Sequence, residues 1–211
     1  MGTSIRSLIE CKNNEDGHWK AIEWEVIEDN YRLFSILANV RNWDDIKPIS
    51  QPRGLPDDLD PERKRIPGDL DHTPMNSREH VTYFNKISCS YYTLKDIKEY
   101  DWNQVATLKR YIRIDSYKEW MKKGKIGEPE NYCLGVFGTS KIISNSEMED
   151  MINFPPNDGE YKAEAFYTQI EWDSSYKDLC PEFYNELIPK LEKLSDKYGG
   201  NENVRIIFCF W

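Results

Sequence analysis

The chain has no apolar run of about 18 residues, so the sequence predicts no membrane-spanning helix. Its first residues also lack the apolar stretch that is typical of a secretion signal. Basic residues are in deficit, with 28 lysines and arginines against 37 aspartates and glutamates and a net charge of −9. Proteins that bind nucleic acid or anionic membranes through surface charge show the opposite balance. We therefore expect neither general nucleic-acid binding nor membrane binding.

Cysteine is also scarce. The five cysteines are odd in number, lie far apart in the sequence and include no Cys-x-x-Cys pair. This pattern is typical of reduced thiols in a cytosol and not of a disulfide framework. The sequence therefore predicts a cytoplasmic protein without a disulfide bond.

Short catalytic and metal-binding motifs are missing. The chain has no Gly-x-Ser-x-Gly, no cysteine–histidine signature and no His-x-His phosphoesterase motif. His72 and His80, with Asp69 and Asp71 nearby, match no standard ligand spacing for a metal. Residues 135–141 contain glycines and a lysine without the Walker spacing, and we interpret them as a turn between strands. The sequence thus favours a binding protein without catalytic residues, metal or cofactor over an enzyme.

Both strand-like and helix-like periodicities occur, which predicts an α+β fold with a mixed or antiparallel sheet and short helices. With 211 residues, the simplest arrangement is one domain over 1–211, with a long irregular loop at about 43–86. Pro189 should kink or split the longest helix because proline has no amide hydrogen. The expected strands cover residues 4–11, 18–27, 104–114, 132–137, 140–143, 162–172 and 204–211, and the expected helices about 31–40, 94–100, 116–123, 144–152 and 181–198. The last strand is apolar on both faces apart from Arg205, which predicts a place in the middle of the sheet. Thr93 should cap the helix at 94–100, and Gly199 should end the last helix.

The stretch from residue 31 to residue 58 is the densest in groups that can bind an anion. Arg41, Asn42 and Trp43 follow the first expected helix, and Asn42 suits its left-handed end. Arg41 can hold a phosphate while Trp43 stacks on a base and Asn42 reads a polar edge. The alternative is that Arg41 only offsets the negative end of the helix dipole.

Arg53 and Gly54 form the second part of this candidate site. They lie between two prolines in the segment PRGLP (52–56), which predicts a stiff turn with exposed amides beside a guanidinium group. Such a turn can bind a phosphate or carboxylate together with Arg41. The alternative is a structural turn in which Arg53 pairs with Asp57 or Asp58.

Three further residues complete the predicted ligand site. Tyr31 and Tyr92 are candidates for stacking on a base, because tyrosine combines a flat apolar face with one polar atom. Glu171 lies in a strongly alternating segment and could pair with a base edge or a ribose hydroxyl. The alternative for Glu171 is a solvated face of a sheet.

Several segments together resemble a family of small proteins of bacteriophage and prophage genomes. They are LFSILANVRN (33–42), PRGLPDD (52–58), YTQIEW (167–172) and VRIIF (204–208). Relatives have a histidine before the helix that here follows residues 86–90, and this chain lacks it; His72 or His80 could replace it. By analogy with phage proteins that sequester nucleotide immune signals, the resemblance implies a counter-defence role in the cytoplasm of an infected bacterium.

We therefore expect a protein that binds and sequesters a small phosphorylated nucleotide, such as a cyclic ADP-ribose isomer or a cyclic oligonucleotide. One alternative is an enzyme that cleaves such a nucleotide, with Asp57, Asp58 or Glu171 as the base. Another is a protein-binding inhibitor of a host defence factor, whose acidic surface pairs with a basic partner. The sequence leaves oligomeric state open, with a homo-oligomer among the options.

Overall fold

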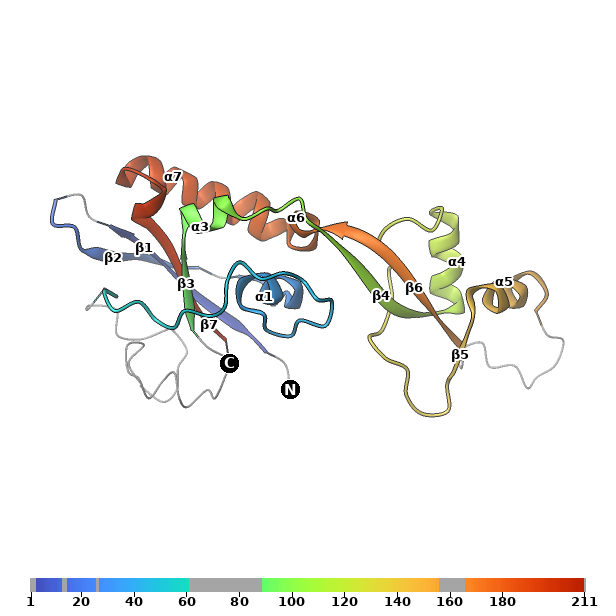
Figure 1. The fold of residues 1–211 in the computed structure, drawn as a ribbon. Coiled ribbons are helices and arrows are strands. Elements are labelled where there is room, and N and C mark those ends of the chain that lie inside the picture. The colour runs from blue at the N-terminus through green and yellow to red at the C-terminus, as the bar shows by residue number, and fades with distance from the viewer. Residues whose placement is uncertain (1–2, 13–14, 26, 61–88, 156–165, 211) are drawn as a thin grey trace. The chain divides into compact units, whose positions relative to one another are not determined.

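The computed structural model describes residues 3–12, 15–25, 27–60, 89–155 and 166–210 (Figure 1). The chain divides into two compact units, residues 1–104 with 176–211 and residues 105–175. The second unit is thus an insertion between two parts of the first. Strands and helices occur in both units, which confirms the predicted α+β class. No linker-like composition marks either boundary, and the sequence pattern alone suggested one domain.

The first unit is built on a four-stranded antiparallel sheet with the order β2-β1-β7-β3. The strands are β1 (Ile5–Lys12), β2 (Trp19–Glu25), β3 (Ser90–Thr93) and β7 (Val204–Phe210). Every residue of β7 is buried, which matches its continuous apolar sequence and confirms the predicted place in the middle of the sheet. The short strand β3 was not anticipated from the sequence.

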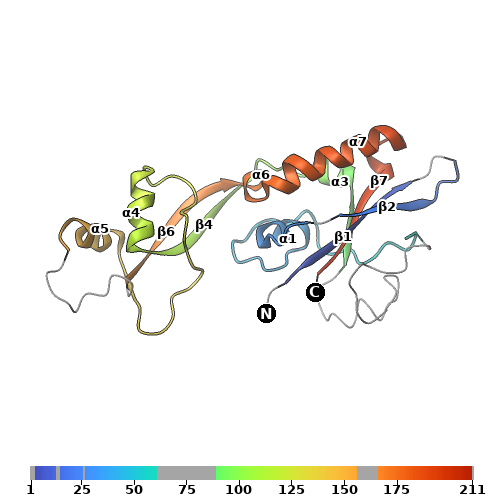
Figure 2. The ribbon, with the colours of Figure 1, turned by 180° about the vertical axis from the view of Figure 1, so that it is seen from behind.

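Helices cover one face of this sheet and a loop covers the other. Phe34 of α1 (Tyr31–Ala38) packs edge-to-face against Phe210 with ring centres 5.0 Å apart. The helix α7 (Ile188–Tyr198) contacts β7 and β1, and two opposite views show it lying along the sheet (Figures 1 and 2). On the opposite face, Leu55 and Leu59 pack against a buried cluster that contains Ile207. The sheet is therefore enclosed on both sides.

The remaining helices of the first unit are short. They are α3 (Leu94–Glu99), α6 (Tyr176–Leu179), the π-helix η2 (Phe183–Leu187) and the 3-10 helix η3 (Asn201–Asn203). Thr93 caps α3 in a capping box with Asp96, and Gly199 ends α7 with a φ of 80°, as the sequence predicted. Pro189 was expected to kink or split its helix; instead the backbone stays helical, and the π-helix η2 passes directly into α7 at Ile188, one residue before the proline.

The second unit has a three-stranded sheet with the order β4-β6-β5. Its strands are β4 (Val105–Arg113), β5 (Lys141–Ile143) and β6 (Phe166–Ser175), and β5 is the one parallel neighbour. The helices α4 (Ile114–Lys122) and α5 (Asn145–Asn153) complete it. Buried Leu108, Ile170 and Trp172 lie on the side of the β4–β6 pair that faces its core.

Several sequence predictions need correction. The expected strand 132–137 is reduced to one isolated bridge between Cys133 and Tyr111. The left-handed end of α1 is Asn39, with a φ of 58°, and not Asn42. The disulfide-free prediction is wrong, since Cys89 and Cys209 form a disulfide over a sequence separation of 120 residues. Residues 69–80, with both candidate histidines, lie outside the described residues.

Candidate functional site

The loop after α1 is held in an unusual backbone conformation. Asn39, Arg41 and Asp45 all have positive φ, between 51° and 58°, which is costly for residues other than glycine. The Asn42 side chain stabilises this loop, because its amide nitrogen donates to the Ile46 carbonyl at 2.7 Å and its oxygen accepts from the Ile46 amide at 2.9 Å. The Asn42 side chain therefore stabilises the loop through the Ile46 backbone, whereas the sequence pattern predicted hydrogen bonding with a ligand.

This loop brings three of the predicted ligand residues together. The Arg41 guanidinium carbon lies 5.8 Å from the ring centres of both Tyr31 and Trp43. The two rings meet edge-to-face at 5.6 Å, and Arg41 Nε donates to Thr3 Oγ1. Trp43 is 51% exposed. The result is an aromatic surface with a cation beside it.

Arg53 does not join this surface in the contacts that the structure describes. Its guanidinium group makes two hydrogen bonds to the carboxylate of Asp96, at 2.9 and 3.1 Å. It also lies 4.8 Å from the ring centre of Tyr92. The alternative pairing of Arg53 with Asp57 or Asp58 is wrong, because Asp58 accepts from Arg205 instead. A guanidinium group that already donates two hydrogen bonds to a carboxylate is less available to bind a phosphate.

The other predicted ligand residues have mainly structural surroundings. Gly54 takes the expected left-handed conformation, with a φ of 78°. Tyr92 is fully buried and its hydroxyl donates to the Leu37 carbonyl, so its ring is enclosed by protein. Glu171 lies on β6 in the second unit, where its exposed carboxylate pairs with Lys109 at 3.0 Å. The solvated-face interpretation of Glu171 fits these contacts.

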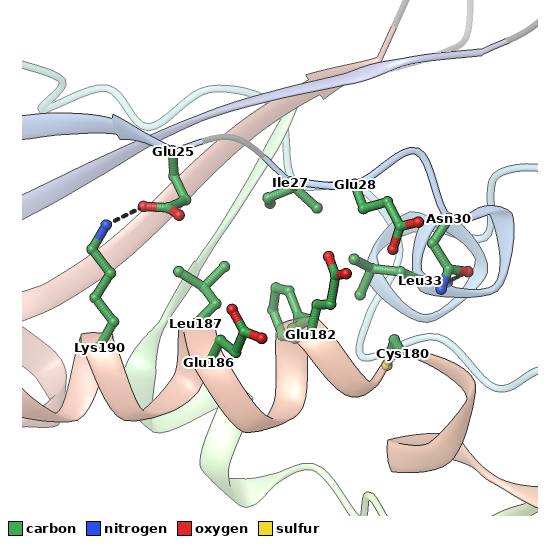
Figure 3. Close-up of a pocket in the computed structure, with 11 residues that line it drawn as sticks. Glu25, Ile27, Glu28, Asn30, Leu33, Cys180, Glu182, Glu186, Leu187 and Lys190 are labelled. Carbon is green, nitrogen blue, oxygen red and sulfur yellow. Dashed lines mark hydrogen bonds and ion pairs between the residues drawn. The ribbon is translucent and has the colours of Figure 1, made fainter.

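The first unit contains a cavity of about 300 Å³ that the sequence did not reveal. Its floor is apolar, because Ile27, Leu33, Phe183 and Leu187 are all buried. Carboxylates surround this floor, and Figure 3 shows those of Glu28 and Glu182 pointing toward one another. The lining residues are Glu25, Ile27, Glu28, Asn30, Leu33, Cys180, Glu182, Phe183, Glu186, Leu187 and Lys190.

Local sequence explains how these residues meet. Asn30 caps α1 by accepting from the amides of Arg32 and Leu33, which turns the chain between β2 and α1. On the other wall, Pro189 has no N–H for the preceding turn, and the Ile188 amide donates to the Phe183 carbonyl five residues earlier. This π-turn carries Glu182 at its start and Glu186 within it. Single π-turns are rare and are frequent at functional sites.

The cavity is strongly acidic. The neighbouring carboxylate of Glu28 raises the pKa of the exposed Glu182 above its ordinary value, with smaller contributions from desolvation and from Glu186. Lys190 is the cation at one end, where its ammonium group contacts Glu25 and lies 3.0 Å from Glu23. Burial raises the pKa of the Cys180 thiol to about 12, so this thiol stays protonated at neutral pH. The cavity therefore suits a positively charged group with an apolar portion.

A second hollow of about 470 Å³ lies where α7 ends, and its lysines have carboxylate partners. Lys95 pairs with Glu202 at 2.7 Å and Lys98 with Glu192 at 2.5 Å.

Within the described ranges there is no cluster of three or more potential metal ligands. In that same part of the chain, no helix is both long enough and apolar enough to cross a bilayer.

Comparison of the chain with protein-family models, with curated proteins and with solved structures gave no match. The cavity and the Arg41 loop must therefore be interpreted from their own chemistry. A signal for the cavity was present in the sequence, since Glu182, Glu186 and Lys190 recur at intervals of four before and after Pro189. It was overlooked because the opposite wall comes from residues about 150 positions earlier.

Proposed function

We propose that this protein is a binding protein whose acidic cavity accepts a positively charged group from a basic partner protein. The observation that carries this proposal is the meeting of Glu28, Glu182 and Glu186 around an apolar floor. A cation in the cavity would be attracted by all three carboxylates. Its alkyl portion would be covered by the buried side chains beneath them.

The electrostatics of the cavity support this proposal. The carboxylate of Glu28 raises the pKa of Glu182, so an ionised Glu182 opposes folding at neutral pH. Such local conflicts are typical of sites retained for function and not for stability. The net charge of −9 adds a long-range attraction for a basic partner, which increases the rate of association and depends on salt.

The resemblance to phage proteins supplies the biological setting of the proposal. A basic host defence factor is a fitting partner for an acidic phage protein that inhibits it. The protein would then act by occupying the partner and not by catalysis.

The test is calorimetric titration with a short peptide that contains lysine and arginine, at low and at physiological salt. We expect the Glu182→Gln, Glu186→Gln double variant to bind at least about tenfold more weakly, since two charge-assisted contacts are lost. An Asp196→Asn variant removes one exposed carboxylate from the same helix and serves as the control. Equal affinity of all three proteins would contradict the proposal.

Sequestration of a nucleotide is the second candidate function, and the Arg41 loop favours it. Arg41 beside the exposed ring of Trp43 offers a phosphate contact next to a stacking surface, on a loop whose conformation is already fixed by Asn42. Titration with cyclic ADP-ribose isomers and cyclic dinucleotides tests it through tryptophan fluorescence, and a Trp43→Phe variant separates the response of Trp43 from that of the other tryptophans. Under this geometry Arg41→Ala weakens binding because Arg41 lies beside Trp43, whereas Arg53→Ala leaves it unchanged because the described contacts of Arg53 are with Asp96 and Tyr92 and not with this surface.

Binding and cleavage of a nucleotide are separated by the state of the released ligand. Intact ligand after heat release and chromatography supports sequestration. Altered ligand supports the enzymatic alternative, and an absence of binding by every nucleotide at micromolar protein removes both.

A further inference from the structure

Lys190 already places an ammonium group at one end of the acidic cavity. Its Nζ lies between Glu25 and Glu23, both on β2, while its backbone belongs to α7. Figure 3 shows the unbranched lysine stem extending from the helix, one turn after Leu187, up to the carboxylate of Glu25. The chain thus contains its own example of a primary ammonium group held at this cavity.

We infer that the cavity selects a primary ammonium group on an unbranched alkyl chain, and that Lys190 is a built-in competitor for that ligand. The inference rests on the proposed function, because it names the chemical group that the same cavity binds. It also adds a regulation, because the ammonium group of Lys190 already lies at one end of the cavity, beside Glu25, and opposes the entry of a second cation.

The arrangement of the carboxylates favours ammonium over guanidinium. Glu28 precedes α1, whereas Glu182 and Glu186 come from the facing helix, so the acceptors surround the cavity from two sides. An ammonium group has three donors around one point and can bond to carboxylates in several directions. A guanidinium group is a flat fork that suits one carboxylate in its plane, as Arg53 and Asp96 show elsewhere in this unit.

The contact made by Lys190 is open to solvent on the lysine side. The Lys190 side chain is 40% exposed, and its partners Glu23 and Glu25 are 42% and 19% exposed, so water screens the ammonium group although one of the two carboxylates is largely covered. The floor beneath the cavity is made by buried apolar side chains, which can cover the methylene groups of an incoming ligand. A ligand that provides both an ammonium and an alkyl chain can therefore replace the lysine contact.

The experiment compares three small probes on the wild-type protein by calorimetry. They are N-acetyl-lysine methylamide, N-acetyl-arginine methylamide and 1,4-diaminobutane. We expect both ammonium probes to bind more tightly than the arginine probe. A lysine-containing hexapeptide is the fourth arm: tighter binding than the diamine identifies a protein side chain as the source, and the reverse identifies a free polyamine.

The role of Lys190 is tested with Lys190→Met, which keeps an unbranched apolar stem and removes the charge. Lys193→Met is the matched control, because it makes the same change at an exposed position of α7. We expect the first variant to bind the lysine probe about two- to fivefold more tightly, the range that an exposed ion pair is worth, and the second to match the wild type. Thermal unfolding of both variants verifies that they fold.

The outcomes separate the two ideas. Preference for the arginine probe, or equal behaviour of the two lysine variants, overturns this inference while the proposed function stands. No binding of any cationic probe or peptide by the wild type overturns both. If Lys190→Met does not fold, the comparison of lysine and arginine probes on the wild type still decides the selectivity.

Discussion

Arg53 and Asp96, 43 positions apart in the chain, face one another through two parallel hydrogen bonds of 2.9 and 3.1 Å. Asp96 also accepts from the amide and hydroxyl of Thr93, which caps α3. Burial alone would raise the pKa of Asp96, but the hydrogen bonds from Arg53 and Thr93 outweigh burial and lower it. One carboxylate therefore fixes both a helix start and the proline-bounded turn.

Replacing Asp96 should destabilise the protein in a pH-dependent way. A group with a lowered pKa in the folded state adds stability above its unfolded pKa and loses it as pH falls through the folded pKa. We expect Asp96→Ala to lower the free energy of unfolding by about 1–3 kcal/mol at pH 7, since a cap and a charged pair are lost. The difference should shrink well below pH 4. Urea unfolding at both pH values measures it.

Arg53→Ala is the informative comparison, because it leaves the Thr93 cap intact and should cost less than Asp96→Ala. A loss from Asp96→Ala that is the same at pH 7 and in acid would contradict the argument.

Glu182→Gln should stabilise the protein near neutral pH. A carboxyl whose pKa is raised on folding binds its proton more tightly in the folded state, so stability rises as pH falls through that pKa. Replacement by a neutral amide removes the repulsion from Glu28 at high pH and removes nothing once the carboxyl is protonated. The melting temperature should therefore rise at pH 8 and stay close to wild type in acid. A lower melting temperature at pH 8 would show that Glu182 does not oppose folding.

Loss of Arg205 should be the most damaging charge substitution. Arg205 and Glu10 are both almost fully buried on adjacent strands, with Arg205 Nη2 2.7 Å from Glu10 Oε2. The guanidinium carbon also lies 3.9 Å from the ring centre of Trp19. We expect Arg205→Met to cost about 3–5 kcal/mol in the free energy of unfolding, because Glu10 would remain buried without its cation.

The double variant Arg205→Met, Glu10→Met distinguishes an unpaired charge from lost packing. Replacing both members of a buried ion pair by apolar side chains is often close to neutral, so part of the stability should return. Chemical denaturation of the three proteins gives the comparison. A double variant no more stable than Arg205→Met would place the loss in the contacts with Trp19, Asp58 and Asp60 and not in the unpaired charge of Glu10.

Breaking the Cys89–Cys209 disulfide should also lower stability. The bond joins residues 120 positions apart, and closing a loop of that length reduces the entropy of the unfolded chain. We expect reduction, or the Cys89→Ser variant, to cost up to about 5 kcal/mol in the free energy of unfolding. The test is thermal unfolding with and without dithiothreitol. The reductant should have no effect on Cys89→Ser, and a response of that variant would show that it acts elsewhere.

Asn42→Ala should release the loop after α1. The side chain satisfies both the amide and the carbonyl of Ile46, so its loss leaves two backbone groups without that partner. We expect a loss of about 1–3 kcal/mol in the free energy of unfolding, and a shift in tryptophan emission that disappears when Trp43 is also replaced by Phe. Asp45→Gly is the control, since Asp45 is exposed in the same loop and glycine suits its left-handed conformation, with a φ of 51°. Unchanged emission and stability in Asn42→Ala would show that the loop conformation does not depend on this side chain.

Sequence patterns predicted elements well wherever the cause is local. The apolar run of β7 and the Thr93 cap each act within a few residues, and both appear as expected. Pro189 also acts locally, but through a π-turn in a continuous helix and not through a kink or a break. The strand predicted at 132–137 is wrong because its cause is not local. Its residues have a composition typical of strands, yet only Cys133 pairs with a strand residue. A strand forms only when a neighbour exists, and composition does not supply one.

The candidate site was predicted in part. Tyr31, Arg41 and Trp43 do meet, because they lie on one helix and the turn that follows it. Arg53 was assigned to the same ligand because its turn looked free, and the carboxylate that occupies it lies on a distant helix. The acidic cavity was missed because its two walls are separated by most of the chain.

The amino-acid sequence by itself determined the α+β class, the helix caps and the excess of negative charge, since each depends on composition or on spacing over a few residues. Only the tertiary structure decided which charges pair, which cysteines join and where carboxylates gather. Those outcomes depend on contacts between residues tens to nearly two hundred positions apart, such as Glu10 and Arg205. The order of residues along the chain does not bring such pairs together. They come into contact only when the sheet and its helices pack against one another.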